Sequence, residues 1–268
     1  MNTIDLSAEI PLISGAFGLY YDNILTQYAL EWELKKAIIE GINDFSHLSI
    51  QNTLPLREAI EDFGNPLIVG TGRCTAITFS TLVVFKRSDG DLYTIIARRS
   101  HAVGVSPGLH HVVPAGMFEA PNIGDKWSIQ ENIWRELLEE LYDENEQIGC
   151  GKSEIKDYIR EQPPINLLIK LIDEGAAELV ITGICCDLLN LRPEICTLLY
   201  VPDSTFVESR KMILNWEYEN NKEIGNFAIP WKQLSGHLKY LASTGSLVPS
   251  GAACISLAQN WLRERHSI

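Results

Sequence analysis

Four acidic residues between positions 136 and 143 have the spacing of a cation site on a helix. Glu136, Glu139, Glu140 and Asp143 stand at i, i+3, i+4 and i+7, which lines them along one helical face. Like charges this close repel one another, at about 0.2–0.5 kcal/mol per pair. Arg135 can offset part of this repulsion by pairing with Glu139 or Glu131, each four residues away. A divalent cation would offset much more, because Mg²⁺ takes oxygen ligands and is usually held by carboxylates together with substrate phosphates.

The residues between these acids predict the helix itself. Apolar side chains recur at three- and four-residue spacing and form one stripe, made of Ile133, Trp134, Leu137, Leu138 and Leu141. The pattern alone leaves a second interpretation open, in which the acids form the solvated face of an ordinary amphipathic helix.

The stretch before the helix favours the cation site. It predicts a short strand at residues 112–113, then a Pro/Gly turn and a loop that leads into the helix. This order, with Pro114-Ala115-Gly116 and Glu119 followed by Arg135-Glu136-Leu137-Leu138-Glu139-Glu140, resembles the signature box of the Nudix hydrolases. With the predicted strands on either side, the resemblance covers roughly residues 74–235.

The chain departs from the family's box in its loop half. Tyr142 stands where the family has a glycine, and Trp127 where it has a glutamate. The loop before Arg135 is also longer than usual, and none of its acids is in register to replace the missing glutamate. The candidates for that replacement are Glu119, Asp125 and Glu131.

The resemblance implies a metal-dependent pyrophosphohydrolase. Nudix hydrolases cleave nucleoside diphosphates linked to another group, so we expect a nucleotide diphosphate derivative as substrate and Mg²⁺ or Mn²⁺ as cofactor. By resemblance the metal ligands are Glu136, Glu139 and Glu140, and Arg135 orients the glutamates. The catalytic base is then Glu140 or an acid of the later loop, Glu219 or Glu223.

Four further residues are candidates for substrate binding. Arg98 and Arg99 end a predicted strand where the family often meets substrate phosphate, although a solvated strand end explains them equally well. Gly116 lets the loop backbone approach metal or phosphate. Trp231 can stack on a base or pack in the core. The adjacent His110 and His111 point to opposite faces of a strand and are not expected to share one metal.

The remaining elements predict an α/β fold, a Nudix-type α/β/α sandwich with a mixed β-sheet. Strands are expected at residues 76–85 and 92–97, joined by an Asp-Gly turn, and at 178–189 and 194–201; a helix is expected at 252–263. We divide the chain into an N-terminal extension, residues 1–70, and a Nudix-like hydrolase domain, residues 71–268. In the extension a helix is expected over residues 24–41, with Leu25, Tyr28, Ala29, Trp32 and Ile39 as core candidates.

Composition limits the partners. The net charge of −13 argues against nucleic-acid binding, which needs clustered Lys and Arg. No apolar run approaches the ~20 residues of a membrane span, and the first residues do not have the pattern of a signal peptide. The six cysteines form no Cys-x-x-Cys pair and are expected to be free thiols, so the expected location is the cytoplasm. A homodimer is possible.

Two other functions remain open at this level. A Nudix-fold module that binds a nucleotide or metabolite without cleaving it is compatible with the altered loop. An isomerase of prenyl diphosphates is the other alternative, but it needs an additional pocket cysteine or acid, and no matching cysteine is evident.

Overall fold

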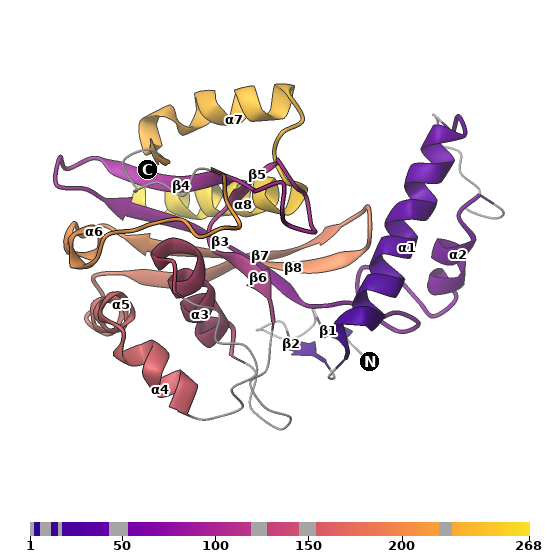
Figure 1. The fold of residues 1–268 in the computed structure, drawn as a ribbon, viewed down its shortest axis with the longest axis horizontal. Helices are drawn as coiled ribbons and strands as arrows, with labels where there is room; N and C mark the ends of the chain where they lie inside the picture. The colour runs from indigo at the N-terminus through magenta and orange to yellow at the C-terminus, as the bar shows by residue number, and fades with distance from the viewer. Residues whose placement is uncertain are drawn as a thin grey trace. The chain divides into compact units, whose positions relative to one another are not determined.

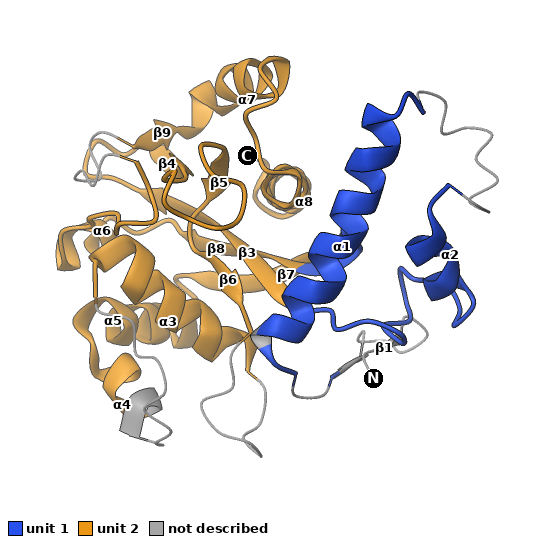
Figure 2. Cartoon of the chain, turned by 45° about the vertical axis from the view of Figure 1, so that its right-hand side comes forward, with its two compact units in different colours: residues 1–77, 186–194 blue, residues 78–185, 195–268 orange. Residues whose placement is uncertain are grey.

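The computed structural model describes residues 3–5, 12–15, 18–42, 53–118, 128–144, 154–219 and 227–268. The chain forms two compact units (Figure 2). Unit 1 consists of Met1–Ile77 and Cys186–Glu194, and unit 2 of Thr78–Cys185 and Ile195–Ile268. The functional division at residue 70 stays a prediction.

A seven-stranded mixed sheet forms the centre of the fold. Its main path runs in the order β5 (His110–Val112), β4 (Leu92–Arg98), β3 (Thr78–Lys86), β8 (Arg192–Val201) and β7 (Glu178–Asp187). Two short strands join it at the side: β6 (Ala115–Met117) pairs with β3, and β9 (Ala228–Pro230) pairs with β4. Residues 78–85 of β3 are buried without interruption, as expected for a strand that is covered on both faces.

Helices cover both faces of this sheet, which confirms the predicted α/β/α sandwich (Figure 1). On one side lie α3 (Ile129–Tyr142), α4 (Glu154–Glu161) and α5 (Pro163–Asp173). On the other side lie α7 (Leu234–Ser243) and α8 (Pro249–His266). The short helix α6 (Thr205–Ser209) and the 3₁₀ turn η2 (Trp231–Gln233) complete the unit.

The predicted hairpin is present, and the predicted Pro/Gly turn is wrong in part. β3 and β4 pair antiparallel around the Asp-Gly turn, with Phe85 opposite Tyr93 and Gly90 at φ 85°. Ala115 and Gly116, expected in a turn, instead form strand β6, with Gly116 opposite Phe79 of β3. The edge of β3 offers free backbone groups there, and pairing satisfies them.

Unit 1 contains a hairpin of β1 (Thr3–Asp5) and β2 (Leu12–Ser14), and the helices α1 (Tyr20–Ile39) and α2 (Pro55–Glu61). The helix expected at residues 24–41 is therefore confirmed, but most of its expected core is not. Four of its five core candidates are exposed: Leu25, Tyr28, Trp32 and Ile39. The face that α1 buries is largely polar and includes Asn23, Gln27 and Glu33. Among the described residues, no helix combines the length and hydropathy needed to cross a membrane.

Candidate active site

Helix α3 carries the predicted acids and is fixed at both ends by local bonds. The hydroxyl of Ser128 accepts a hydrogen bond from the backbone N–H of Glu131 (3.2 Å), which caps the first turn. The helix ends at Asp143, which is in the left-handed conformation with φ 51°. The predicted helix is confirmed, and Ile133, Trp134, Leu137 and Leu141 of its apolar stripe are completely buried.

The acidic face of α3 is buried as well, so the interpretation as a solvated face is wrong. Glu140 is only 1% exposed, and Glu136 and Glu139 are nearly as inaccessible. Burying a carboxylate is costly unless it is paired or hydrogen-bonded. Their contacts therefore show how the fold compensates for that cost.

Arg135 compensates two of the three glutamates. Its guanidinium group donates to Glu136 (2.8 Å) and to Glu139 (3.1 Å). The pairing with Glu139 is the i, i+4 contact expected from the sequence. Glu131, the other expected partner, instead accepts from Arg160 of α4. Arg135 thus pairs with both carboxylates at once.

Gly116 lies directly against the carboxylate of Glu136. A Cβ atom at position 116 would stand 2.8 Å from the Cγ of Glu136 and closer still to its carboxylate oxygen. Real Cβ atoms do not approach other atoms so closely, so position 116 has to be glycine as long as Glu136 keeps its place. The glycine thus makes room for the side chain of Glu136, a predicted metal ligand. Its predicted role of letting the backbone approach metal or phosphate stays a prediction.

Glu140 is held by two hydrogen bonds from outside its own helix. The backbone N–H of Ala115 donates to one carboxylate oxygen (2.9 Å), and the hydroxyl of Tyr218 donates to the other (2.9 Å). Burial raises the pKa of Glu140 well above its usual value, and the charges of Glu136 and Glu217 raise it further. Burial also raises the pKa of Tyr218. Burial and the neighbouring charges both favour the protonated form of Glu140 relative to an exposed glutamate.

The segment 213–219 brings Tyr218 and Glu217 to this site by docking on the end of α3. The backbone N–H groups of Ile213 and Asn215 donate to the carbonyls of Leu141 (2.9 Å) and Glu140 (3.2 Å). These carbonyls belong to the last turn of α3, where no intrahelical donor remains. The sequence had pointed to Glu219 and Glu223 of the later loop, and not to Glu217 or Tyr218.

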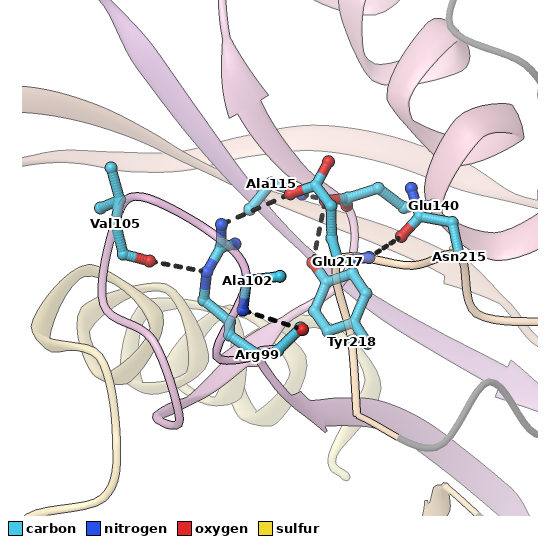
Figure 3. A network of polar contacts seen from close by, with 9 residues as sticks. Arg99, Ala102, Val105, Ala115, Glu140, Asn215, Glu217 and Tyr218 are labelled. Atoms are coloured by element: carbon cyan, nitrogen blue, oxygen red, sulfur yellow. Dashed lines mark hydrogen bonds and ion pairs between the residues drawn. The ribbon is translucent and has the colours of Figure 1, made fainter.

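Arg99, the residue directly after strand β4, completes the cluster (Figure 3). Its side chain donates to the carbonyl of Val105 (3.1 Å) and pairs with Glu217 (3.4 Å). The guanidinium group also lies 6.0 Å from the ring centre of Tyr218. The positive charge of Arg99 counteracts the rise in the pKa of Glu140, so it acts electrostatically on the site.

Arg98 points elsewhere and is half exposed. It pairs with Glu219 (2.9 Å) and donates to the carbonyl of Gly108 (2.8 Å). Glu219 also lies 3.3 Å from His101. From the sequence, Arg98 and Arg99 were equal candidates for substrate binding, but the structure places them differently. Arg99 joins the glutamate cluster, whereas Arg98 pairs with Glu219.

The other predicted site residues fall into two groups. Trp231 packs, half-buried, against the core cluster that includes Leu234, Ile255 and Leu262 of α7 and α8, on the side of the sheet opposite α3. Glu223 lies outside the described residues, as do Glu119, Asp125 and Trp127. His110 contacts Ser246 and His237 of the α7 region, whereas His111 contacts Ser250 of α8.

Tyr142, which replaces the family's glycine, is a buried residue of the last helical turn. Arg210 lies over its ring at 5.5 Å, and its backbone forms a bridge with Ile213. Burial raises the pKa of its hydroxyl, which has no hydrogen-bond partner within the described part of the chain. Here the tyrosine supports the docking of segment 213–219.

The donor set of this cluster fits a hard divalent cation in chemistry and charge. Four carboxylates, those of Glu136, Glu139, Glu140 and Glu217, face two guanidinium groups, those of Arg99 and Arg135. With all acids ionised, the cluster would carry two excess negative charges in a buried setting. Among the described residues no three acids already converge as a metal site, so binding would require the carboxylates to exchange present hydrogen bonds for the ion.

Comparison with known proteins adds little to this geometry. No protein-family model matches the chain, and no curated protein matches it. The NUDIX domain of NrtR from Shewanella oneidensis, solved with ADP ribose, is 12% identical; the match covers 76% of this chain and 98% of that one, with a TM-score of 0.41. A NUDIX hydrolase from Alicyclobacillus acidocaldarius is 11% identical, with 69% and 91% covered and a TM-score of 0.38.

A protein from Deinococcus radiodurans is 14% identical, with 72% of this chain and 89% of that one covered and a TM-score of 0.37. At these values the likenesses carry no argument about activity or site residues. The chain's own elements define an α/β/α sandwich with a buried carboxylate cluster on one helix. In the order of strand, Pro-Ala-Gly and acidic helix, it resembles the Nudix superfamily.

Proposed function

We propose that this protein is a metal-dependent hydrolase that cleaves the diphosphate linkage of a nucleotide derivative. The observation that carries the proposal is the buried excess of carboxylates over arginines around Glu140. Such an excess is unfavourable in the protein alone. It becomes favourable when a divalent cation occupies the cluster.

The proposed roles follow from the contacts. Glu136, Glu139 and Glu140 would hold Mg²⁺ or Mn²⁺, with Glu217 close enough to contribute charge. When bound, the ion would neutralise the diphosphate and lower the pKa of an attacking water. Arg135 keeps Glu136 and Glu139 in position. Arg99 offers a positive charge beside the cluster. Arg98 and Trp231 are weaker candidates for substrate contacts, because Arg98 pairs with Glu219 and Trp231 packs against the core.

Glu140 is the residue that we propose as the base, with Glu223 as the alternative. Its two oxygens are held by Ala115 and Tyr218, which fixes the orientation of the carboxylate. A raised pKa brings a carboxyl closer to the range in which it can accept and release a proton near neutral pH.

The compartment is part of the proposal. Five cysteines lie among the described residues, Cys74, Cys185, Cys186, Cys196 and Cys254, and all five are free thiols. Free thiols are typical of a reducing compartment, which supports the cytoplasm as the place of action.

A binding module without turnover is the second candidate. It is favoured by the occupancy of the acids, because Arg135 holds two of them and Glu140 already has a partner on each oxygen. In that case the cluster would stabilise the fold or recognise a ligand, and no water would be activated.

A hydrolysis screen with Mg²⁺ and Mn²⁺ distinguishes the hydrolase from the binding module. The substrates are nucleoside triphosphates, nucleotide sugars, dinucleotides and dinucleoside polyphosphates, and released products are measured by chromatography. We expect turnover that requires the metal, and a kcat that falls about 10²–10⁴-fold in Glu140→Gln with little change in substrate affinity. Gln keeps the size of the side chain and can still bond to Ala115 and Tyr218.

The matched control is Glu144→Gln, which removes a carboxylate four residues further on that pairs with Arg210 outside the cluster. It should leave kcat unchanged. Tight binding of one of these compounds without hydrolysis under any metal condition would favour the binding module.

A further inference from the structure

Helix α1 presents an apolar stripe on its exposed side, interrupted only at Lys35. The residues of this stripe and their exposed fractions are Tyr21 (74%), Leu25 (71%), Tyr28 (40%), Trp32 (62%) and Ile39 (84%). Their spacing alternates between four and three residues once Lys35 is included, which is the a/d pattern of a coiled coil. The stripe runs along almost the whole 20-residue helix.

The opposite face of α1 is fixed within unit 1 by hydrogen bonds. Glu33 accepts from the backbone N–H of Leu56 (2.5 Å) and of Arg57 (3.3 Å), at the start of α2. The side chain of Asn23 accepts from the N–H of Ala76 (3.1 Å). The two bonds of Glu33 satisfy backbone N–H groups of the first turn of α2, which have no partner within that helix. Rotating α1 to bury its stripe inside unit 1 would break all of these hydrogen bonds, so the stripe faces out of this unit.

We propose that the stripe is a dimer interface, and that its occupant is α1 of a second copy of the chain, packed antiparallel. Antiparallel coiled coils pair an a position with a d position of the partner. With the two-fold axis at residue 30, Tyr28 meets Trp32 of the second copy, and Tyr21 meets Ile39 of the second copy. The third layer places Leu25 against the aliphatic stem of Lys35 of the second copy.

The charges beside the stripe fit this arrangement. Asp22 and Lys36 occupy equivalent flanking positions near the two ends of α1, so antiparallel pairing places each Asp22 opposite Lys36 of the second copy. Glu31 would face Glu31 of the second copy across the axis. Lys35 of the same helix already pairs with it (2.5 Å) and neutralises its charge. Parallel pairing would instead place Lys36 beside Glu31 of the second copy and leave Asp22 without a basic partner.

The area of the stripe also suits a dimer. Together with Ile38, and at about 150–250 Å² for each large side chain, the exposed fractions amount to about 700 Å² of apolar surface per copy. A standard interface buries about 800 Å² on each partner, whereas the largest apolar patch of a typical monomer is about 300–600 Å².

Sedimentation equilibrium of the full chain at micromolar concentration tests the interface. We expect twice the chain mass of 30.0 kDa. Trp32→Glu should raise the dissociation constant at least about thirty-fold. The matched control is Tyr240→Glu, which places the same charge at an exposed aromatic residue of α7 and should leave the dimer intact. A monomeric wild-type chain, or a dimer that Trp32→Glu leaves unchanged, overturns the proposal.

Cysteine cross-linking tests the register without disrupting the interface. In the proposed arrangement the double variant Leu25→Cys with Lys35→Cys forms intermolecular disulfides under mild oxidation. Leu25→Cys alone does not, because its two copies lie ten residues apart along the axis, about 15 Å, beyond the reach of a disulfide. The wild-type chain controls for native thiols. Cross-linking of the single variant as efficiently as the double variant overturns the antiparallel register.

Discussion

At the scale of single residues, the candidate site is defined by close contacts that leave little room for substitution. Gly116 touches the carboxylate of Glu136, and Glu140 has a partner on each oxygen. The spacing of the acids on α3 was predictable because a helix repeats locally. The surroundings of Glu140 were not, because they include Tyr218, which lies 78 positions further along the chain.

The first residue-scale prediction concerns Gly116. Replacing it by alanine puts a methyl group where the Glu136 side chain lies, so Gly116→Ala should lower the free energy of unfolding by about 1–3 kcal/mol. It should also weaken Mn²⁺ binding by displacing a ligand. Urea denaturation and metal titration measure the two effects. Gly236→Ala is the matched control, because a Cβ there meets no atom within 4 Å. Equal stability of the two variants would contradict the contact.

The second residue-scale prediction concerns pH. Folding raises the pKa of Glu140 above its ordinary value of 4.5, mainly through burial. In this range the folded state holds a proton that the unfolded state has released, so stability falls as the pH rises. The fall should begin near the unfolded pKa and continue up to the raised folded value. Urea denaturation across this pH range in a metal chelator measures it.

Glu140→Gln should flatten that part of the stability profile, because the variant has no proton to release at this position. An unchanged slope in the variant would assign the effect to other carboxyl groups.

At the scale of elements, the sequence predicted those whose pattern is local and missed those that depend on docking. The hairpin of β3 and β4 and the helix α3 follow from alternation, turn residues and helical spacing. Strand β6 was missed because it forms only by pairing with β3. The buried face of α1 was assigned to the wrong side, because its apolar stripe predicted the core while its polar residues cap α2.

The element-scale prediction concerns segment 213–219, which reaches the site through Tyr218. Tyr218→Phe keeps the ring and removes the hydroxyl that donates to Glu140. Loss of this buried bond should lower the free energy of unfolding by about 1–3 kcal/mol and weaken Mn²⁺ binding, because Glu140 is no longer held in place. Tyr240→Phe, at an exposed position, should change neither quantity. Unaltered Mn²⁺ affinity in Tyr218→Phe would show that the bond does not position the ligand.

At the scale of the whole molecule, the net charge of −13 and the buried acidic cluster act in the same direction. Negative charge accumulates in the folded state, and a divalent cation relieves part of it. The net charge was evident from the sequence, but composition could not predict that some of the acids would be buried together.

The whole-molecule prediction is therefore that Mn²⁺ or Mg²⁺ raises Tm. A ligand that binds only the folded state at one hundred times its Kd adds about 2.7 kcal/mol. The shift in Tm, measured by calorimetry, should disappear in Glu139→Gln and Glu140→Gln. Without metal, both variants should be as stable as the wild type or slightly more stable, because each removes one repelling charge. Clear destabilisation of both metal-free variants would mean that these acids serve the fold instead.

The division of the chain into units limits how the protein can be cut. The tip of the β7–β8 hairpin, Cys186–Glu194, belongs to unit 1 although its strands belong to the central sheet. Arg57 donates to the carbonyls of Leu188 and Leu189 in that tip, and Leu191 packs with Leu30 and Ile60. The chain thus passes between the units three times. Removing residues 1–77 would expose the apolar hairpin tip, because its packing partners Leu30 and Ile60 would be lost. We therefore expect that the N-terminal part cannot be removed without destabilising the rest of the chain.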